Sequence, residues 1–141
     1  MKSTDIFTFR HKSHEHFPFF TGSVKAGFPS QADDYIEKPL DFNEYLVRHP
    51  AATFCVKVSG DSMINAGIFP NDILVVDRAL NAVNNSIVIA VVNAEFTVKR
   101  IQFNNGKISL LPENPAYNPI YIDNENFEVW GVVTYVIHKP K

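Results

Sequence analysis

The sequence predicts a mainly β protein with a compact, curved, β-rich body, one short helix and a flexible N-terminal arm. From residue 53 onward, short apolar runs with strand-like alternation are separated by asparagine-rich turns, the pattern of successive strands. Residues 1–40, in contrast, keep no helical or strand period and contain several glycine and proline residues. The length of 141 residues suits one domain with a sizeable core.

The predicted elements follow in order along the chain. Residues 1–40 form an extended arm with local strand pairing, whose aromatic stretch at 17–20 docks on the body. Asp41 caps a short helix over residues 42–48, which ends before Pro50. The strands of the body are predicted at residues 53–59, 73–77, 87–92, 96–103, 107–111 and 129–137. The turns between them contain asparagine, which tolerates a left-handed backbone, and the Asn-Asn-Gly run at 104–106 signals a hairpin.

Charge is distributed unevenly between the arm and the body. Residues 1–26 carry four basic and two acidic residues, whereas residues 27–141 carry nine basic and thirteen acidic residues. An acidic body is a poor candidate for direct DNA binding, which needs clustered lysine and arginine to displace counterions. We therefore expect protein partners and no sequence-specific contact with DNA.

Cysteine content and hydropathy indicate a cytoplasmic protein. Cys55 is the single cysteine, so no internal disulfide can form, which agrees with a reducing compartment. On its predicted strand we expect it to be a small buried hydrophobe. No apolar run reaches transmembrane length, and the first residues lack the core of a signal peptide.

Ser62 and Lys99 are the candidate catalytic residues. A serine hydroxyl is a poor nucleophile until a base takes its proton, and a lysine can be that base once burial lowers its pKa. Strand alternation places Lys99 on one face with Thr97, Ile101 and Phe103, where it would be desolvated, and turns Arg100 to the other face. Taken singly, each residue has an ordinary interpretation, as part of a polar turn or as a solvated surface lysine.

A small-residue bond upstream, Ala26–Gly27, is the candidate cleavage site. It lies in the run Ala-Gly-Phe-Pro-Ser at 26–30, within the arm. A small residue before the cut and a glycine after it allow the backbone to enter a narrow cleft without a side-chain clash. Cleavage there would separate a basic arm from an acidic body.

These three motifs, in this order and spacing, resemble those of the UmuD proteins, the self-cleaving subunits of an error-prone DNA polymerase, and more distantly those of the LexA-type repressors. The resemblance extends from about Ala26 to the C-terminus and includes the stretches at 116–120 (AYNPI) and 130–133 (WGVV). Two positions depart from the family pattern: Ala26 stands where the best-known UmuD has cysteine, and Asn71 stands where glycine is usual.

The resemblance implies a LexA/UmuD-type serine peptidase fold without a cofactor. It implies Ser62 as nucleophile, Lys99 as general base, the backbone amides of Asp61 and Ser62 as the oxyanion hole, and a cut between Ala26 and Gly27. The arm at 1–26 would be lost, residues 27–40 would remain as an extended arm, and 41–141 would be the peptidase body. The implied partners are a second copy of the chain, a recombinase filament on single-stranded DNA as activator, and an error-prone polymerase catalytic subunit, in SOS mutagenesis and translesion synthesis.

Three other kinds of protein share part of this pattern. A LexA-type or phage-type repressor with the same peptidase body would need a helix-turn-helix domain before the cut, but only 26 residues without helical periodicity precede Gly27. A binding module that lost the protease would not need the intact serine, lysine and cleavage motifs. A membrane-anchored signal peptidase also uses a Ser-Lys pair but would need an apolar anchor.

Histidines provide only a weak indication of a metal site. His11, His14 and His16 are clustered in the arm without a matching second group of ligands, so we expect a solvated, pH-sensitive arm and no bound metal. His49 and His138 lie outside every motif.

Overall fold

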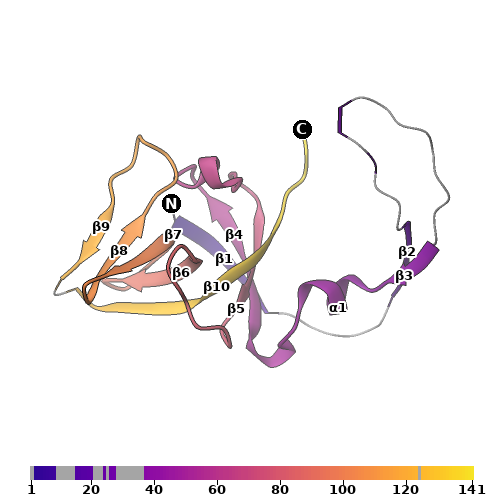
Figure 1. Ribbon diagram of the computed structural model, residues 1–141, viewed down its shortest axis with the longest axis horizontal. Coiled ribbons are helices and arrows are strands. Elements are labelled where there is room, and N and C mark those ends of the chain that lie inside the picture. Colours follow the sequence, from indigo (N-terminus) through magenta and orange to yellow (C-terminus); the bar gives the residue numbers. More distant parts are fainter. Residues whose placement is uncertain (1, 9–14, 21–23, 25, 28–36, 124) are drawn as a thin grey trace.

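The structure is a computed structural model of the chain, and it describes all residues except 1, 9–14, 21–23, 25, 28–36 and 124 (Figure 1). The described part contains strands β1 (Lys2–Thr8), β2 (Phe17–Phe20), β3 (Glu37–Leu40), β4 (Thr53–Ser59), β5 (Ile73–Asp77), β6 (Ile87–Val92), β7 (Glu95–Asn104), β8 (Lys107–Leu111), β9 (Ile120–Ile122) and β10 (Phe127–Ile137). It also contains one α-helix, α1 (Phe42–Leu46), and two 3₁₀ turns, η1 (Pro50–Ala52) and η2 (Ile64–Ala66). The predicted mainly β fold with one short helix is confirmed. No helix of the described residues is long and apolar enough to span a membrane.

Eight strands form one antiparallel sheet in the order β1-β4-β5-β10-β6-β7-β8-β9. The long strand β10, yellow in Figure 1, pairs through its first half with β6 and through its second half with β5. Its register shifts between Val129 and Gly131 and again between Val133 and Tyr135, and such bulges bend a strand.

The sheet curves until distant strands meet. β1 approaches β7, although β4, β5, β10 and β6 separate the two in the sheet order. This curvature brings the turn after β4, which contains the predicted serine, close to β7, which contains the predicted lysine. Gly131 lies at one of the bends, where an added Cβ would be 2.7 Å from Val76 Cγ1 and 3.1 Å from the Asp77 carbonyl oxygen. A side chain there would push β10 away from β5.

Alternating residues of the strands fill the interior of the curve. On β4, Phe54, Val56 and Val58 are buried and pack with Met63 and Ile68, which follow the strand. Complete burial of such a side chain contributes roughly 1.5–3 kcal/mol. A second buried cluster, made of Val88, Ala90, Ile101 and Leu110, lies between β6, β7 and β8.

Cys55 differs from its prediction. The alternation on β4 directs Phe54 and Val56 into the core, so Cys55 points to the opposite face and is only half-buried. Burial nevertheless raises the pKa of its thiol. The prediction of a small buried hydrophobe was wrong because neighbouring strand positions face opposite sides of the sheet.

Asparagines hold the turns as predicted. Asn71, Asn85, Asn93 and Asn105 have φ values of 74°, 73°, 49° and 52°, in the left-handed region that asparagine tolerates. At the 104–106 turn, Gly106 follows with φ 77°, and β7 and β8 form the expected hairpin.

The helix is shorter than predicted. Asp41 is its N-cap, and its Oδ1 accepts hydrogen bonds from the backbone N–H groups of Asn43 and Glu44 at 2.9 and 3.4 Å. The helix ends at Leu46 because Val47 adopts extended dihedrals (φ −123°, ψ 107°) and buries its side chain.

The N-terminal segments take two separate places. β1 extends the large sheet by pairing with β4, from Lys2 opposite Ser59 to Thr8 opposite Phe54. β2 and β3 form a two-stranded sheet of their own, which lies beyond α1 and away from the large sheet in Figure 1. The predicted docking of the aromatic stretch on the body is limited. The ring centroids of Phe17 and Phe42 lie 5.6 Å apart, but the side chain of Phe17 stays half exposed.

Candidate active site

The nucleophile lies in a tight turn directly after β4. Gly60, with φ 85°, lets the chain turn sharply, a conformation that a residue with a side chain rarely adopts. Ser62 follows and is completely buried, as is its neighbour Met63, whose side chain belongs to the core. The packing of Met63 in the core therefore fixes the position of the neighbouring serine.

The structure brings Ser62 and Lys99 together. Lys99 lies on β7, and its Nζ donates hydrogen bonds to Ser62 Oγ at 3.2 Å, to Thr97 Oγ1 at 2.8 Å and to the carbonyl oxygen of Val98 at 3.1 Å. The two residues are 37 positions apart in the chain, so only the curvature of the sheet makes them neighbours.

Burial prepares the lysine to act as a base. Lys99 is only 3% exposed, and this burial lowers its pKa below the ordinary value of 10.5 because the charged ammonium loses solvation. Ile101 is buried on the same strand face, as predicted, whereas Phe103 is 41% exposed and lies at the surface. Arg100 turns away, and its Nε donates to Glu113 Oε1 at 2.6 Å.

A loop after β8 surrounds the turn that contains the serine. The backbone N–H of Glu113 donates to the Ser62 carbonyl oxygen at 2.8 Å. The side-chain Nδ2 of Asn114 donates to the Asp61 carbonyl oxygen at 2.9 Å, and Tyr117 Oη donates to Asp61 Oδ1 at 2.6 Å. The hydrogen bond to Asp61 raises the pKa of Tyr117. Asn114 was not predicted from the sequence, and Tyr117 was predicted only as part of the stretch that resembles the family.

A cleft of about 450 Å³ opens beside Lys99. One wall comes from β7 and includes Phe96 and Thr97, and the other comes from Tyr117 to Ile120. The cleft offers apolar and polar surface next to Lys99, as a site for an extended peptide requires.

Ala26 and Gly27 lie in an exposed bend. Gly27 has φ 138°, and no atom lies within 4 Å of the place where its Cβ would be. Ser62 is buried whereas this bond is exposed, and no atom of Ser62 or Lys99 lies within 4 Å of the Gly27 Cβ position, so the candidate bond is not docked on the reactive pair in the described conformation.

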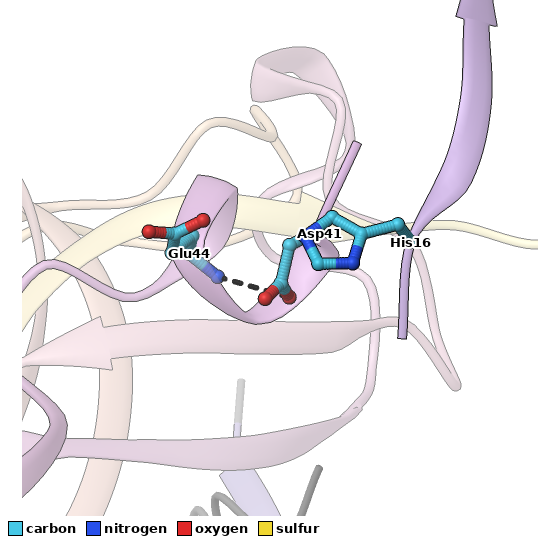
Figure 2. A group of neighbouring side chains, drawn as sticks. All are labelled: His16, Asp41 and Glu44. Carbon is cyan, nitrogen blue, oxygen red and sulfur yellow. Dashed lines mark hydrogen bonds between the residues drawn. The ribbon is translucent and has the colours of Figure 1, made fainter. Parts of the chain in front are cut away.

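The remaining histidines have local partners where they are described. His11 and His14 lie outside the described residues. His16 lies near Asp41 and Glu44, with one possible ligand atom of each within 4.8 Å of the others (Figure 2). The carboxylate of Asp41 is already engaged as the helix cap. The sequence indicated no role for His49 and His138. In the structure, Nδ1 of His49 lies 2.6 Å from Oδ2 of the buried Asp77, and Nδ1 of His138 lies 2.6 Å from Oδ1 of the buried Asp72.

Comparison with known proteins finds relatives that match most of this chain. SamA of Salmonella typhimurium strain LT2 is 49% identical over 124 residues, which cover 88% of this chain and 86% of SamA. MucA of Escherichia coli is 46% identical over 134 residues, covering 93% and 91%. The LexA repressor of Bordetella parapertussis is 40% identical over 117 residues, 82% of this chain but 54% of the repressor.

The family model described as Peptidase S24-like matches residues 18–134, most of the chain. This match and the relatives confirm the predicted resemblance to UmuD and the LexA/UmuD-type fold. The family match and the relatives lead to one assignment: the chain belongs to the Peptidase S24-like family.

Proposed function

We propose that this protein is a serine peptidase that cuts its own chain between Ala26 and Gly27, with Ser62 as nucleophile and Lys99 as general base. One observation carries the proposal: the two side chains meet at 3.2 Å in a buried setting that favours neutral lysine. Membership of a peptidase family supports this kind of chemistry.

The residues suit the two steps of acyl transfer. Neutral Lys99 accepts the proton of Ser62 as Oγ bonds to the Ala26 carbonyl carbon. The amides of Asp61 and Ser62 stabilise the resulting oxyanion. The Lys99 ammonium then gives its proton to the Gly27 nitrogen as the carbon–nitrogen bond breaks, leaving an ester on Ser62. Water, deprotonated by Lys99, hydrolyses this ester and restores the serine.

The arm must bring its bond into the cleft before this chemistry begins. We infer that contact with a recombinase filament on single-stranded DNA favours the docked arm without supplying chemical groups. The trimmed body, residues 27–141, then acts as a homodimer and as accessory subunit of an error-prone polymerase in SOS mutagenesis and translesion synthesis. The resemblance to UmuD supports these partners.

Mass spectrometry of the cleavage products tests the proposal. The protein is incubated with an activated recombinase filament, and separately at alkaline pH, and we expect fragments 1–26 and 27–141. Ser62→Ala should remain intact under both conditions, whereas Ser109→Ala, a serine on β8 outside the site, should be cut as the parent is. Cutting of Ser62→Ala, or a cut at another bond, would overturn the assignment.

Sedimentation of the 27–141 fragment tests the dimer separately. We expect a dimer at micromolar concentration, as the resemblance to UmuD implies, although cleavage removes β1, which pairs with β4 in the large sheet. A monomeric fragment would contradict this part of the proposal and leave the cleavage chemistry unaffected.

A further inference from the structure

The loop at 113–117 donates hydrogen bonds to the backbone carbonyl groups of the turn that contains Ser62. Asn114 Nδ2 donates to the Asp61 carbonyl oxygen at 2.9 Å, and the Glu113 N–H donates to the Ser62 carbonyl oxygen at 2.8 Å. The two peptide units on either side of the Ser62 α-carbon are therefore both held by this loop. Neither contact involves the reactive Oγ, so their effect on catalysis must come through the backbone.

The Asp61 carbonyl and the Ser62 N–H belong to the same peptide unit. That unit is planar and trans, so its C=O and N–H point in opposite directions. A donor that fixes the direction of the carbonyl thereby fixes the direction of the amide. A hydrogen bond to the carbonyl also polarises the unit and strengthens the N–H as a donor.

We propose that Asn114 is a positioning residue for the oxyanion hole: by holding the Asp61 carbonyl, it aims the Ser62 N–H at the oxygen that becomes charged during cleavage. This inference rests on the proposed function. Tyr117 supports the same turn by donating to the Asp61 carboxylate, at 2.6 Å.

Asn114 is itself held in place for this role. Its Oδ1 accepts from the Ala116 N–H at 3.0 Å, and its carbonyl accepts from the Tyr117 N–H at 3.1 Å, which closes a turn. Glu113, the preceding residue, is tied to Arg100 on β7. The amide of Asn114 thus uses its acceptor inside the loop and its donor toward the serine turn, and this division of roles allows the two to be separated by mutation.

Asn114→Ser separates the two roles. A serine hydroxyl can still accept from the Ala116 N–H, as serine does in such turns, but it is too short to reach the Asp61 carbonyl, and it adds no charge. Asn84→Ser is the matched control, because the Asn84 Oδ1 also accepts a backbone N–H, that of Phe103 near the end of β7, and among the described residues Asn84 makes no hydrogen bond with the serine turn.

The rate of self-cleavage is measured from pH 7 to 10.5 for the parent and both variants. Loss of a direct oxyanion donor costs about 10²–10³ in rate, so the weaker loss of its alignment in Asn114→Ser should lower the plateau rate about tenfold. The pH midpoint should stay unchanged because the surroundings of Lys99 are intact. Asn84→Ser should match the parent.

A second measurement does not depend on cleavage. In the ¹H–¹⁵N spectrum, the Ser62 amide should shift in Asn114→Ser and stay in place in Asn84→Ser. A parental plateau rate or an unmoved Ser62 amide in Asn114→Ser would overturn the inference, as would a slowing explained by a shifted midpoint. Failure of the proposed function looks different, since the parent itself would then remain uncut.

Discussion

Burial of Lys99 predicts a specific dependence of stability on pH. The side chain is 3% exposed, and burial lowers its pKa below the ordinary value of 10.5. Between these two pKa values the unfolded chain binds more protons at this position than the folded chain does. Lys99 therefore makes the free energy of unfolding rise with pH in this window, which lies above the lowered pKa and below 10.5.

Lys99→Met removes this contribution and keeps a side chain of similar length. Each pKa unit corresponds to about 1.4 kcal/mol, so the stability of the parent relative to Lys99→Met should rise by about 1.4 kcal/mol per pH unit inside the window. Below the lowered pKa and above the ordinary value, the difference should be constant. Methionine cannot make the hydrogen bonds of Lys99 to Thr97 and Val98. Their loss changes the stability difference between the two proteins by a constant amount and leaves its slope against pH unchanged.

Urea unfolding from pH 7 to 10.5 measures the difference. The parent and the Lys99→Met protein both carry Ser62→Ala, so that self-cleavage does not interfere with the unfolding measurement. Lys107→Met serves as control, since it removes an exposed lysine from the β7–β8 hairpin and should give a constant difference from its parent. A constant difference for Lys99→Met as well would show that Lys99 titrates like a solvated lysine. That result would refute its role as a base.

Three further predictions follow from the same geometry. The rate of self-cleavage should rise about tenfold per pH unit below the pKa of Lys99 and then level, and Lys99→Arg should be inactive at every pH since guanidinium stays charged; a plateau near pH 7 would indicate a histidine base instead. Gly27→Val should abolish cutting with Ser62 intact, and normal processing in mass spectra would place the cut elsewhere. Gly131→Ala should lower the free energy of unfolding by roughly 1–3 kcal/mol, because its Cβ would meet Val76 Cγ1 at 2.7 Å; unchanged denaturant midpoints would contradict this.

Local sequence signals predicted most of the body. Alternation located β4, β5, β6 and β8 at the observed bounds, and it placed β7 and β10 within one or two residues of their ends. The asparagine turns were predictable because the left-handed conformation depends on the residue itself. The pairing of β1 with β4 and the short strand β9 were not predicted, because long-range partners decide whether such segments become strands.

The site residues, too, fall into those that the sequence predicted and those that depend on long-range contacts. Ser62 and Lys99 were identified through their chemistry and the family resemblance, but their contact depends on how the whole sheet curves. Asn114 carried no such signal. Its hydrogen bond joins it to Asp61, 53 positions earlier, and the sequence around it shows only the asparagine and proline residues of an ordinary turn.

The arrangement implies why self-cleavage is slow without an activator under the proposed mechanism. Ser62 and Lys99 are already in contact, and core packing and the 113–117 loop hold the serine turn, so no further assembly of the reactive pair is needed. The Ala26–Gly27 bond, in contrast, lies exposed and is not docked on the pair. Docking of the arm is then an unfavourable equilibrium that precedes the chemical step, so the observed rate is the chemical rate multiplied by the small fraction of chains with a docked arm. An activator that binds the docked conformation therefore raises the rate without changing the pH midpoint, whereas substitutions at Lys99 change the pH dependence with or without the activator.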